Sequence, residues 1–387
     1  MPNIKKGMMG AAGASAVGGE SLFAWGANSG GGSSGGKLGL GDILNRSSPV
    51  QVGDLTDWLV VGAGHRTTSV VKSDGSLWSW GLGSSGVSGH GNTTHLSSPV
   101  QVGALTDWFH VASGSMTIGI KTNGTIWSWG NAAYGQTGQG DTTNLSSPVQ
   151  IGSLTDWKGE TSDDLEDGIN IKLSLGVYTV NVIKDDGTLW GWGTNNNGQG
   201  GWGPSDKSSP VQIGSDTDWR NLSAEFNDNQ VATRTDGTLW AWGANSTGQL
   251  GQGNTTAYSS PVQIGTATDW VQGAACGPFT HAIKTNGTLW AVGNNGYGQL
   301  GTGNTTTLSS PVQVGSLTNW KLARSGLQFG RFIKTDGTLW VCGRNNNGQL
   351  GQGDTTDLSS PVQVGSATDW GNLCTGSDFT IATRDIE

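Results

Sequence analysis

The pentapeptide Ser-Ser-Pro-Val-Gln occurs seven times in this chain of 387 residues, and its regular spacing constrains the fold more than any other feature. The copies begin at Ser47, Ser97, Ser146, Ser208, Ser259, Ser309 and Ser359. Successive copies lie 49 to 51 residues apart, except for the third and fourth, which are separated by 62 residues. A period near 50 residues is typical of arrays in which each unit buries its apolar face against its neighbours. Seven such units are enough to close a ring.

The order of segments within each unit predicts about four short β-strands. An Asp-Gly or Asn-Gly pair, such as Asp236-Gly237, lies between two β-prone runs in six of the units. Such a pair is a strong hairpin signal, and we expect a type I′ turn, in which both central residues have positive φ. A further strand follows each Thr-Asp-Trp, and another follows each proline. The proline should lie at a strand start or an edge, because it cannot donate a hydrogen bond. Four strands form the blade of a β-propeller.

Tryptophan recurs at fixed places in the units, which accounts for 18 of the 19 in the chain. Seven follow Thr-Asp or Thr-Asn: Trp58, Trp108, Trp157, Trp219, Trp270, Trp320 and Trp370. Six follow the glycine of the turn by three residues: Trp78, Trp127, Trp190, Trp240, Trp290 and Trp340. Five precede the next glycine: Trp25, Trp80, Trp129, Trp192 and Trp242. We interpret these as structural positions that pack neighbouring blades together, because a buried tryptophan contributes a large apolar area.

The two ends of the chain supply complementary parts of one unit. The last unit stops after Asp378–Arg384, where its hairpin partner should begin, and Ser21–Gly26 matches the missing partner strand. We therefore predict an all-β, seven-bladed propeller at residues 19–387, with the N- and C-terminal strands sharing one blade. This closure would remove sheet edges that promote aggregation. Residues 1–18 lie outside the repeats and are expected to form a flexible or partner-bound arm.

The repeated pattern Gly-Thr-Leu-Trp-x-Trp-Gly-x-Asn-x-x-Gly-Gln-Leu-Gly, complete at residues 237–251, resembles the repeat of the regulator of chromosome condensation family. The resemblance covers about residues 19–387 and implies a seven-bladed propeller. Members of that family include a guanine-nucleotide exchange factor for a nuclear GTPase, a plant ultraviolet-B photoreceptor and secreted bacterial inhibitors of β-lactamase. What they share is protein recognition by loop-bearing faces. The chain departs from the exchange factor, because its N-terminal segment has only Lys5 and Lys6 and no basic nuclear-targeting tail.

Composition narrows the classes of partner. The net charge is −9 and only 13% of residues are charged, which argues against nucleic acid or an anionic membrane as partner. No apolar run is long enough to span a bilayer. The three cysteines have no metal-ligand spacing and predict no disulfide framework. We find no set of residues that would form a catalytic or metal site, and we expect no cofactor and no enzymatic activity.

Departures from the repeat are the places where a specific function is most plausible. The segment between Trp157 and Trp190 is longer than in the other units, and its extra residues carry five carboxylates: Glu160, Asp163, Asp164, Glu166 and Asp167. This insertion is either a solvated acidic loop, a partner-binding protrusion or, less in keeping with its spacing, a calcium loop. Trp202, the one tryptophan outside the pattern, is either a lid over the blade or an exposed contact. The Gly/Ser-rich run from Ser29 to Gly36 is expected only to lengthen a loop.

These observations favour a non-enzymatic protein-interaction or structural module. One hypothesis is a bacteriophage virion decoration or tail-associated protein whose residues 1–18 bind other virion subunits. A second is a soluble, inhibitor-like propeller that recognises one globular partner. A third is a regulator similar to the exchange factor. The low charge and the missing nuclear features favour a virion or extracellular location over the cytoplasm, and a nuclear location is not expected.

Overall fold

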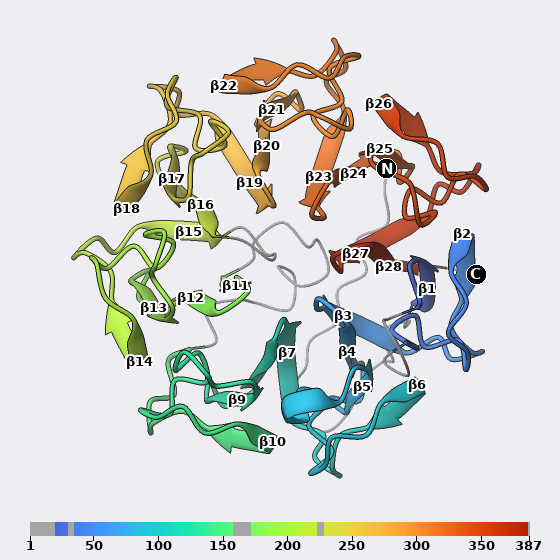
Figure 1. Ribbon diagram of the computed structural model, residues 1–387, viewed down its shortest axis with the longest axis vertical. Helices are drawn as coiled ribbons and strands as arrows, with labels where there is room; N and C mark the ends of the chain where they lie inside the picture. Colours follow the sequence, from blue (N-terminus) through green and yellow to red (C-terminus); the bar gives the residue numbers. More distant parts are fainter. Residues whose placement is uncertain (1–19, 30–34, 158–171, 223–227, 386–387) are drawn as a thin grey trace, which may run out of the picture.

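The computed structural model describes residues 20–29, 35–157, 172–222 and 228–385, and these residues form seven antiparallel sheets arranged around a central axis (Figure 1). Every sheet has four strands. The predicted seven-bladed propeller is therefore confirmed. Within the described residues the only helical element is the 3-10 turn η1 (Ser84–Gly86).

The seven blades follow one another along the chain. Blade 1 contains β3 (Trp58–Ala63), β4 (Thr67–Lys72), β5 (Leu77–Gly81) and β6 (Leu96–Gln101), and blade 2 contains β7 (Trp108–Ser113), β8 (Met116–Lys121), β9 (Ile126–Gly130) and β10 (Leu145–Gln150). Blade 3 contains β11 (Leu173–Leu175), β12 (Thr179–Ile183), β13 (Leu189–Gly193) and β14 (Lys207–Gln212), and blade 4 contains β15 (Trp219–Leu222), β16 (Asn229–Arg234), β17 (Leu239–Gly243) and β18 (Tyr258–Gln263). Blade 5 contains β19 (Trp270–Cys276), β20 (Phe279–Lys284), β21 (Leu289–Gly293) and β22 (Leu308–Gln313), and blade 6 contains β23 (Trp320–Ser325), β24 (Phe329–Lys334), β25 (Leu339–Gly343) and β26 (Leu358–Gln363). Blade 7 joins β27 (Trp370–Thr375) and β28 (Phe379–Arg384) to β1 (Ser21–Gly26) and β2 (Arg46–Gln51).

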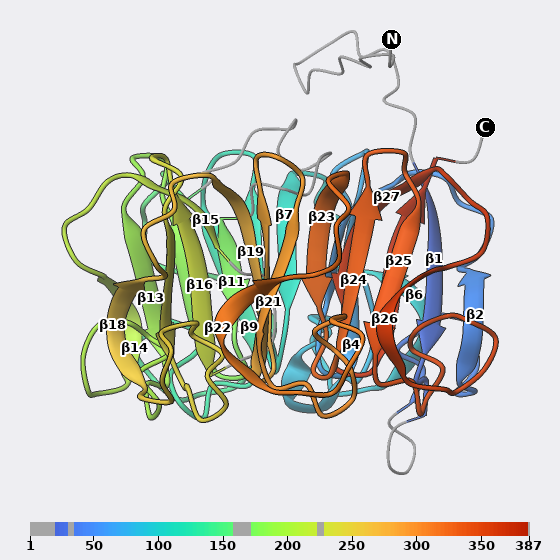
Figure 2. The same ribbon diagram turned by 90° about the horizontal axis from the view of Figure 1, so that it is seen from above.

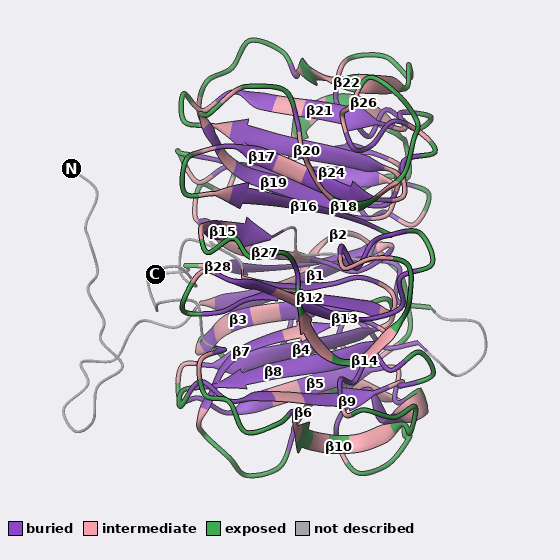
Figure 3. Cartoon of the chain, turned by 90° about the vertical axis from the view of Figure 1, so that its left-hand side faces the viewer, coloured by how far each residue is buried: buried purple, intermediate pink, exposed green. Residues whose placement is uncertain are grey.

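The first strand of each blade lies nearest the axis, and the Ser-Ser-Pro-Val-Gln strand lies at the periphery (Figure 1). Each proline is thus on an edge strand, as predicted, where its missing N–H removes no ladder bond. The inner strands are almost wholly buried, whereas outer strands such as β10 and β22 alternate between partly buried and exposed residues (Figure 3).

The ring closes where the sequence predicted. Strand β1 pairs with β28 in antiparallel register, from Ser21 opposite Arg384 to Gly26 opposite Phe379. Residues Phe23 and Ala382 face each other in the middle of this ladder. The two ends of the chain therefore share blade 7, and the whole ring depends on this contact.

The prediction of type I′ turns was wrong, although the hairpins exist. At the turn between β4 and β5, Gly75 has φ +78°, but the only non-glycine residue with positive φ in the described ranges is Ser85. Asp74 therefore has negative φ. The N–H of Gly75 donates to Lys72 O at 2.9 Å, and Lys72 N donates to Ser76 O at 2.9 Å. This is the three-residue hairpin loop in which one glycine in the left-handed region follows an ordinary turn.

The tryptophans of the repeat lie between blades. Trp58, which is 1% exposed, packs with Leu22 and Ile381 of blade 7 as well as with Val70 and Trp80 of its own blade. The six equivalent tryptophans that follow Thr-Asp or Thr-Asn are at most 6% exposed. Burial of such large rings at each interface is the main apolar contribution to holding the blades together.

The ring has two faces, and each face carries a different set of turns and loops (Figure 2). One face, which we call the turn face, carries the Asp-Gly or Asn-Gly turns and the Thr-Asp-Trp segments. These interlock between blades, because Trp108 N of blade 2 donates to Gly75 O of blade 1 at 3.1 Å. The opposite face, which we call the loop face, carries the turns between the first two strands of each blade and the long loops between the last two.

Candidate protein-interaction surface

On the turn face, every blade buries a cation against two aromatic rings. In blade 1 the Lys72 ammonium lies 4.7 Å from the ring centre of Trp58 and 4.4 Å from that of Trp78. It also pairs with Asp57 at 3.3 Å, and the lysine side chain is only 6% exposed. The cation–π contacts and the carboxylate together compensate for the burial of the charge. The equivalent cations are Lys121, Lys184, Arg234, Lys284, Lys334 and Arg384.

A second repeated device fixes the tryptophan of the third strand. Asp74 Oδ1 accepts hydrogen bonds from Ser76 N at 2.8 Å and Ser76 Oγ at 2.6 Å. Ser76 Oγ in turn accepts from Trp78 Nε1 at 2.9 Å. These hydrogen bonds hold the pKa of the Asp74 carboxyl below its usual range, against the opposing effect of its partial burial. Because the same chain of bonds recurs in blades 2 to 6, the turn face is committed to holding the frame.

The loop face instead carries large side chains that are present in some blades and absent from others. Tyr134, which is 43% exposed, lies against Tyr178 of the next blade with ring centres 4.7 Å apart. Tyr297, which is 37% exposed, lies 5.0 Å from the Arg344 guanidinium, and Arg344 also donates to Gln328. Exposed tyrosine and arginine are the residue types most enriched at protein interfaces. The loop face is therefore the surface with the composition of a recognition site.

A cluster of charged side chains lies on the loop face where blade 7 meets blade 1. We call Lys37, His65, Arg66 and Asp378 the seam cluster. The turn of blade 1 is tied to that of blade 7, because Ser377 Oγ donates to His65 O at 3.0 Å. The Lys37 ammonium lies 5.3 Å from the ring centre of Phe379.

Lys37 breaks the repeat at a structural position. Five of the other six blades have glutamine here, whereas blade 1 has Val87, and Gln349 Oε1, for example, accepts a hydrogen bond from Asn347 N at 2.9 Å. The Lys37 backbone still does what the glutamine backbone does, because its carbonyl accepts from Trp80 Nε1 at 3.0 Å and Thr68 Oγ1 at 2.9 Å. Only the side chain has changed, from an amide that accepts a bond to a buried amine that cannot.

Burial lowers the pKa values of two basic groups in the seam cluster. The Lys37 residue is 5% exposed, and this desolvation lowers the pKa of its amine from 10.5 to about 8, with Asp378 opposing the shift and Arg66 adding to it. Desolvation also lowers the pKa of His65, and the nearby charges of Arg66 and Lys37 lower it further. Three basic side chains and one carboxylate thus gather at one point of an acidic protein.

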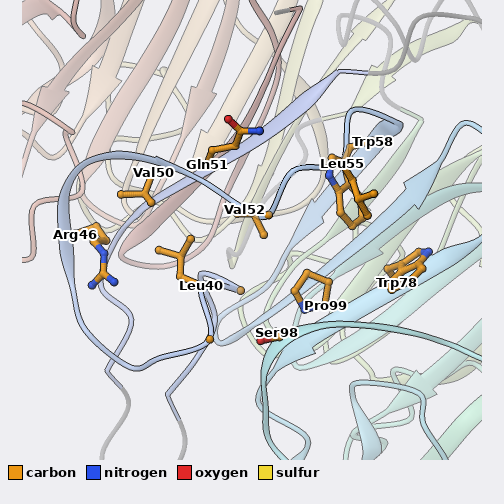
Figure 4. Close-up of a pocket in the computed structure, with 13 residues that line it drawn as sticks. Leu40, Arg46, Val50, Gln51, Val52, Leu55, Trp58, Trp78, Ser98 and Pro99 are labelled. Carbon is orange, nitrogen blue, oxygen red and sulfur yellow. The ribbon is translucent and has the colours of Figure 1, made fainter.

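Shallow apolar grooves lie at the rim between blades. The groove between blades 7 and 1 encloses about 520 Å³ and is lined by Leu40, Val50, Leu55, Trp78 and Pro99 among others (Figure 4). Equivalent grooves of about 490 Å³ and 220 Å³ lie between blades 1 and 2 and between blades 5 and 6. These grooves are built from repeat positions, so they offer nearly the same surface several times.

The candidate residues predicted from the sequence are only partly placed by the structure. The carboxylates Glu160, Asp163, Asp164, Glu166 and Asp167 lie outside the described residues, as does the arm at 1–18. Trp202 is partly buried: its ring covers Gly191 and Gly200, and its Nε1 donates to Ser205 O at 2.8 Å. It packs against the apolar cluster that includes Ile213. Its role in partner binding stays a prediction.

The seam cluster was missed, although the sequence held a signal for it. Aligning the units places Lys37 in Gly36-Lys37-Leu38-Gly39 opposite the glutamine of Gly-Gln-Leu-Gly. Its neighbours His65 and Asp378 are distant in the sequence and are brought together only by closure of the ring.

The described part of the chain offers little for catalysis or metal binding. Its His, Cys, Asp and Glu side chains form no group of three or more that could hold a metal ion. His281 is fully buried between aromatic rings, and desolvation lowers its pKa to about 3. Burial also raises the pKa of the Cys342 thiol to about 12. No helix among the described residues is long and apolar enough to cross a membrane.

The chain is similar to a known protein family in sequence and to solved proteins in structure. The sequence model of the regulator of chromosome condensation (RCC1) repeat matches residues 74–118, 123–158, 236–281, 286–330 and 336–383, which is more than half of the chain. No curated protein matches in sequence.

Solved structures share the fold at low sequence identity. Human WBSCR16 is 20% identical, with a TM-score of 0.80 over 95% of this chain and 99% of that protein. Prp20p from Saccharomyces cerevisiae, whose structure was reported with its binding properties to Gsp1p and histones, is 16% identical. Its TM-score is 0.80 over 96% of this chain and 93% of Prp20p. At these identities the likeness shows the fold alone.

Proposed function

Because the chain belongs to the regulator of chromosome condensation (RCC1) repeat family, we propose that it is a non-enzymatic protein-interaction module that recognises one protein partner through its loop face. Propellers of this kind hold many unrelated binding functions on one frame, so the function must be argued from the surface rather than from the fold. The observation that carries the proposal is the contrast between the two faces.

The two faces differ in their exposed side chains, although repeated segments such as Gly-Gln-Leu-Gly also lie on the loop face. On the turn face, the tryptophans, cations and aspartates of each blade are engaged in holding the ring together. On the loop face, Tyr134 and Tyr297 occupy one repeat position that holds serine, asparagine, threonine or glycine in the other blades, and neither Tyr178 nor Arg344 has the same residue as its counterpart in another blade. Exposed tyrosine side chains on a rigid scaffold are well suited to binding one partner, because they lose little conformational entropy on binding.

The absence of enzymatic activity is part of the proposal. His281, which would be the natural base in a strand position, is buried, and its low pKa keeps it uncharged. A general base must reach the proton that it removes, and a fully buried imidazole does not.

The more specific hypotheses differ in whether the partner belongs to a large particle or to a small, discrete complex. A virion decoration protein would bind its particle through the arm at residues 1–18, whereas a soluble binder would form a discrete complex. A regulator similar to an exchange factor is a second candidate, supported by the shared fold of Prp20p and its reported binding to Gsp1p. Sedimentation of the native protein separates the first two, since a virion protein is expected in a heavy particle fraction and a soluble binder at the size of a small complex.

The face used for binding is tested with matched substitutions. The partner is purified with the native protein and identified, and its affinity is then measured for Tyr134→Ala, for Tyr297→Ala and for the control Leu105→Ala. Leu105 is 50% exposed and lies on the turn face, at one of the rim grooves. We expect at least one tyrosine variant to weaken binding roughly tenfold or more, with the control unchanged. Loss of binding in the control alone would place recognition on the turn face or in the rim grooves instead.

A further inference from the structure

The basic side chains of the seam cluster are available to bind a negatively charged group. None of the side chains of Lys37, His65 and Arg66 makes a hydrogen bond or ion pair with any part of the chain that the structure describes. The carboxylate whose charge acts on both Lys37 and His65 is that of Asp378. Three basic groups therefore share one acidic neighbour, in a chain whose net charge is −9.

The Lys37 amine is the most buried of these basic groups. It is 5% exposed, and the groups that favour its charge are the face of the Phe379 ring and, at longer range, the Asp378 carboxylate, which makes no salt bridge with it. Each of the seven repeat cations of the turn face has two aromatic rings, and all but Lys334 also have a carboxylate in a salt bridge among the described residues. A buried ammonium without an oxygen partner is costly, and an oxyanion in contact with it would remove that cost.

The position of Lys37 in the repeat strengthens this argument. Glutamine occupies the equivalent place in other blades, for example Gln249 and Gln349. Its side chain accepts a hydrogen bond from a backbone N–H, and because it is uncharged it carries no penalty for burying a charge. Arg66 also has an uncharged counterpart, because the residue before the second strand of blade 6 is Gln328. Blade 7 thus carries a cation where five other blades carry glutamine, and the counterparts of Arg66 vary, with Ser115 and Pro278 among them.

We propose that the seam cluster is an oxyanion-binding site that receives a carboxylate or phosphate group of the protein partner. Lys37 and Arg66 would donate hydrogen bonds to the group, and His65 would add a further donor. Arginine and lysine bind such anions through short, charge-assisted hydrogen bonds. The inference rests on the proposed function, because it names the chemistry that the loop face recognises at this point.

The site is tested on the whole protein with probes that need no knowledge of the partner. A hexaglutamate peptide, a phosphoserine peptide of the same length and inorganic phosphate are titrated by calorimetry at low salt. The variant is Lys37→Gln combined with Arg66→Gln, which installs residues already present in other blades and should therefore fold. The control is Lys207→Gln, which removes a cation from the outer strand β14 of blade 3, away from the seam cluster. Thermal melting of each variant verifies that the ring is intact.

We expect saturable binding of at least one probe by the wild-type protein and the control. The double variant should bind roughly tenfold or more weakly. Preference for the phosphoserine peptide would assign a phosphate, and preference for hexaglutamate a carboxylate. Equal binding by the wild type and the double variant, or no saturable binding by the wild type, would overturn the inference. If the seam cluster fails this test while the tyrosine variants still lose the partner, the proposed function stands without it.

Discussion

Replacing Lys37 with glutamine is expected to stabilise the protein at neutral pH. The substitution removes a buried ammonium that has no oxygen partner and installs the side chain found at this position in other blades. In those blades the glutamine oxygen accepts a backbone hydrogen bond, as Gln249 does from Thr247 N at 3.0 Å. A gain in stability from a substitution in a well-packed protein is unusual, which makes the expectation a sharp test.

The magnitude follows from the pKa of the amine. Burial lowers the pKa of Lys37 from 10.5 in the unfolded chain to about 8 in the folded protein. Since each tenfold change in proton affinity is worth about 1.4 kcal/mol, keeping this lysine charged in the folded state costs up to about 3 kcal/mol. Below pH 8 the lysine is protonated in both states and the full cost applies. Between pH 8 and 10.5 the unfolded chain holds the extra proton, so the wild type gains stability as pH rises, and above pH 10.5 the cost is gone.

The assay is urea unfolding of the wild type and Lys37→Gln at pH 7, 8.5 and 10. We expect the variant to be more stable by about 2 to 3 kcal/mol at pH 7, with an advantage that shrinks steadily toward pH 10. A variant that is less stable than the wild type at pH 7, or an advantage that does not depend on pH, would refute the reasoning. Together with the proposed anion site, the expected result would mean that stability has been given up for binding at this position.

Three further expectations follow from the frame. Asn319→Asp should raise stability by about 0.5 kcal/mol in urea unfolding, because blade 6 is the blade in which the cation, Lys334, faces asparagine instead of aspartate. Gly75→Ala should cost roughly 3 kcal/mol or more by the same assay, since its Cβ would lie 2.2 Å from Thr106 O, whereas Gly53→Ala, also at positive φ but with open space around it, should cost roughly 1 kcal/mol. Deleting residues 380–387 removes most of β28 and should abolish cooperative melting of a monomer; a truncated chain that still melts cooperatively as a monomer by light scattering and calorimetry would contradict the closure.

The architecture was predictable from the sequence because it is repeated. Seven copies of one pentapeptide, a turn signal in six units and tryptophans at fixed places all point to the same blade, and a blade buries its faces only in an array. The closing strand pair was predictable for the same reason, since Ser21–Gly26 supplies the strand that the last unit lacks.

The type of each turn was harder to predict from the sequence than the strands. The Asp-Gly pairs predict hairpins, but the choice between turn types depends on the register of the flanking strands. Here Lys72 accepts from Gly75 N and donates to Ser76 O, so a three-residue loop forms and only the glycine needs positive φ. The turn is also bonded to the segment that precedes β3, because Ser73 N donates to Asp57 O, and the Asp-Gly pair itself does not encode this contact.

The candidate surface was the least predictable part. Sequence reasoning looked for function in the largest departures from the repeat, the acidic insertion and Trp202. The seam cluster instead arises from a single substitution, Lys37, and from neighbours that lie far away along the chain. Such a site becomes visible only when His65 and Asp378 are seen on adjacent turns across the closed ring.

The central claim, that one partner is recognised through the loop face, is tested most directly by hydrogen exchange of the native complex. Backbone amide exchange is measured by mass spectrometry for the free protein and for the protein with its purified partner. The account predicts slowed exchange in the loop-face segments, including residues 64–66, 131–136, 294–299 and 376–378, and unchanged exchange in the Asp-Gly turns of the opposite face. Protection confined to the turn face, with no change in the loop-face segments, would contradict it.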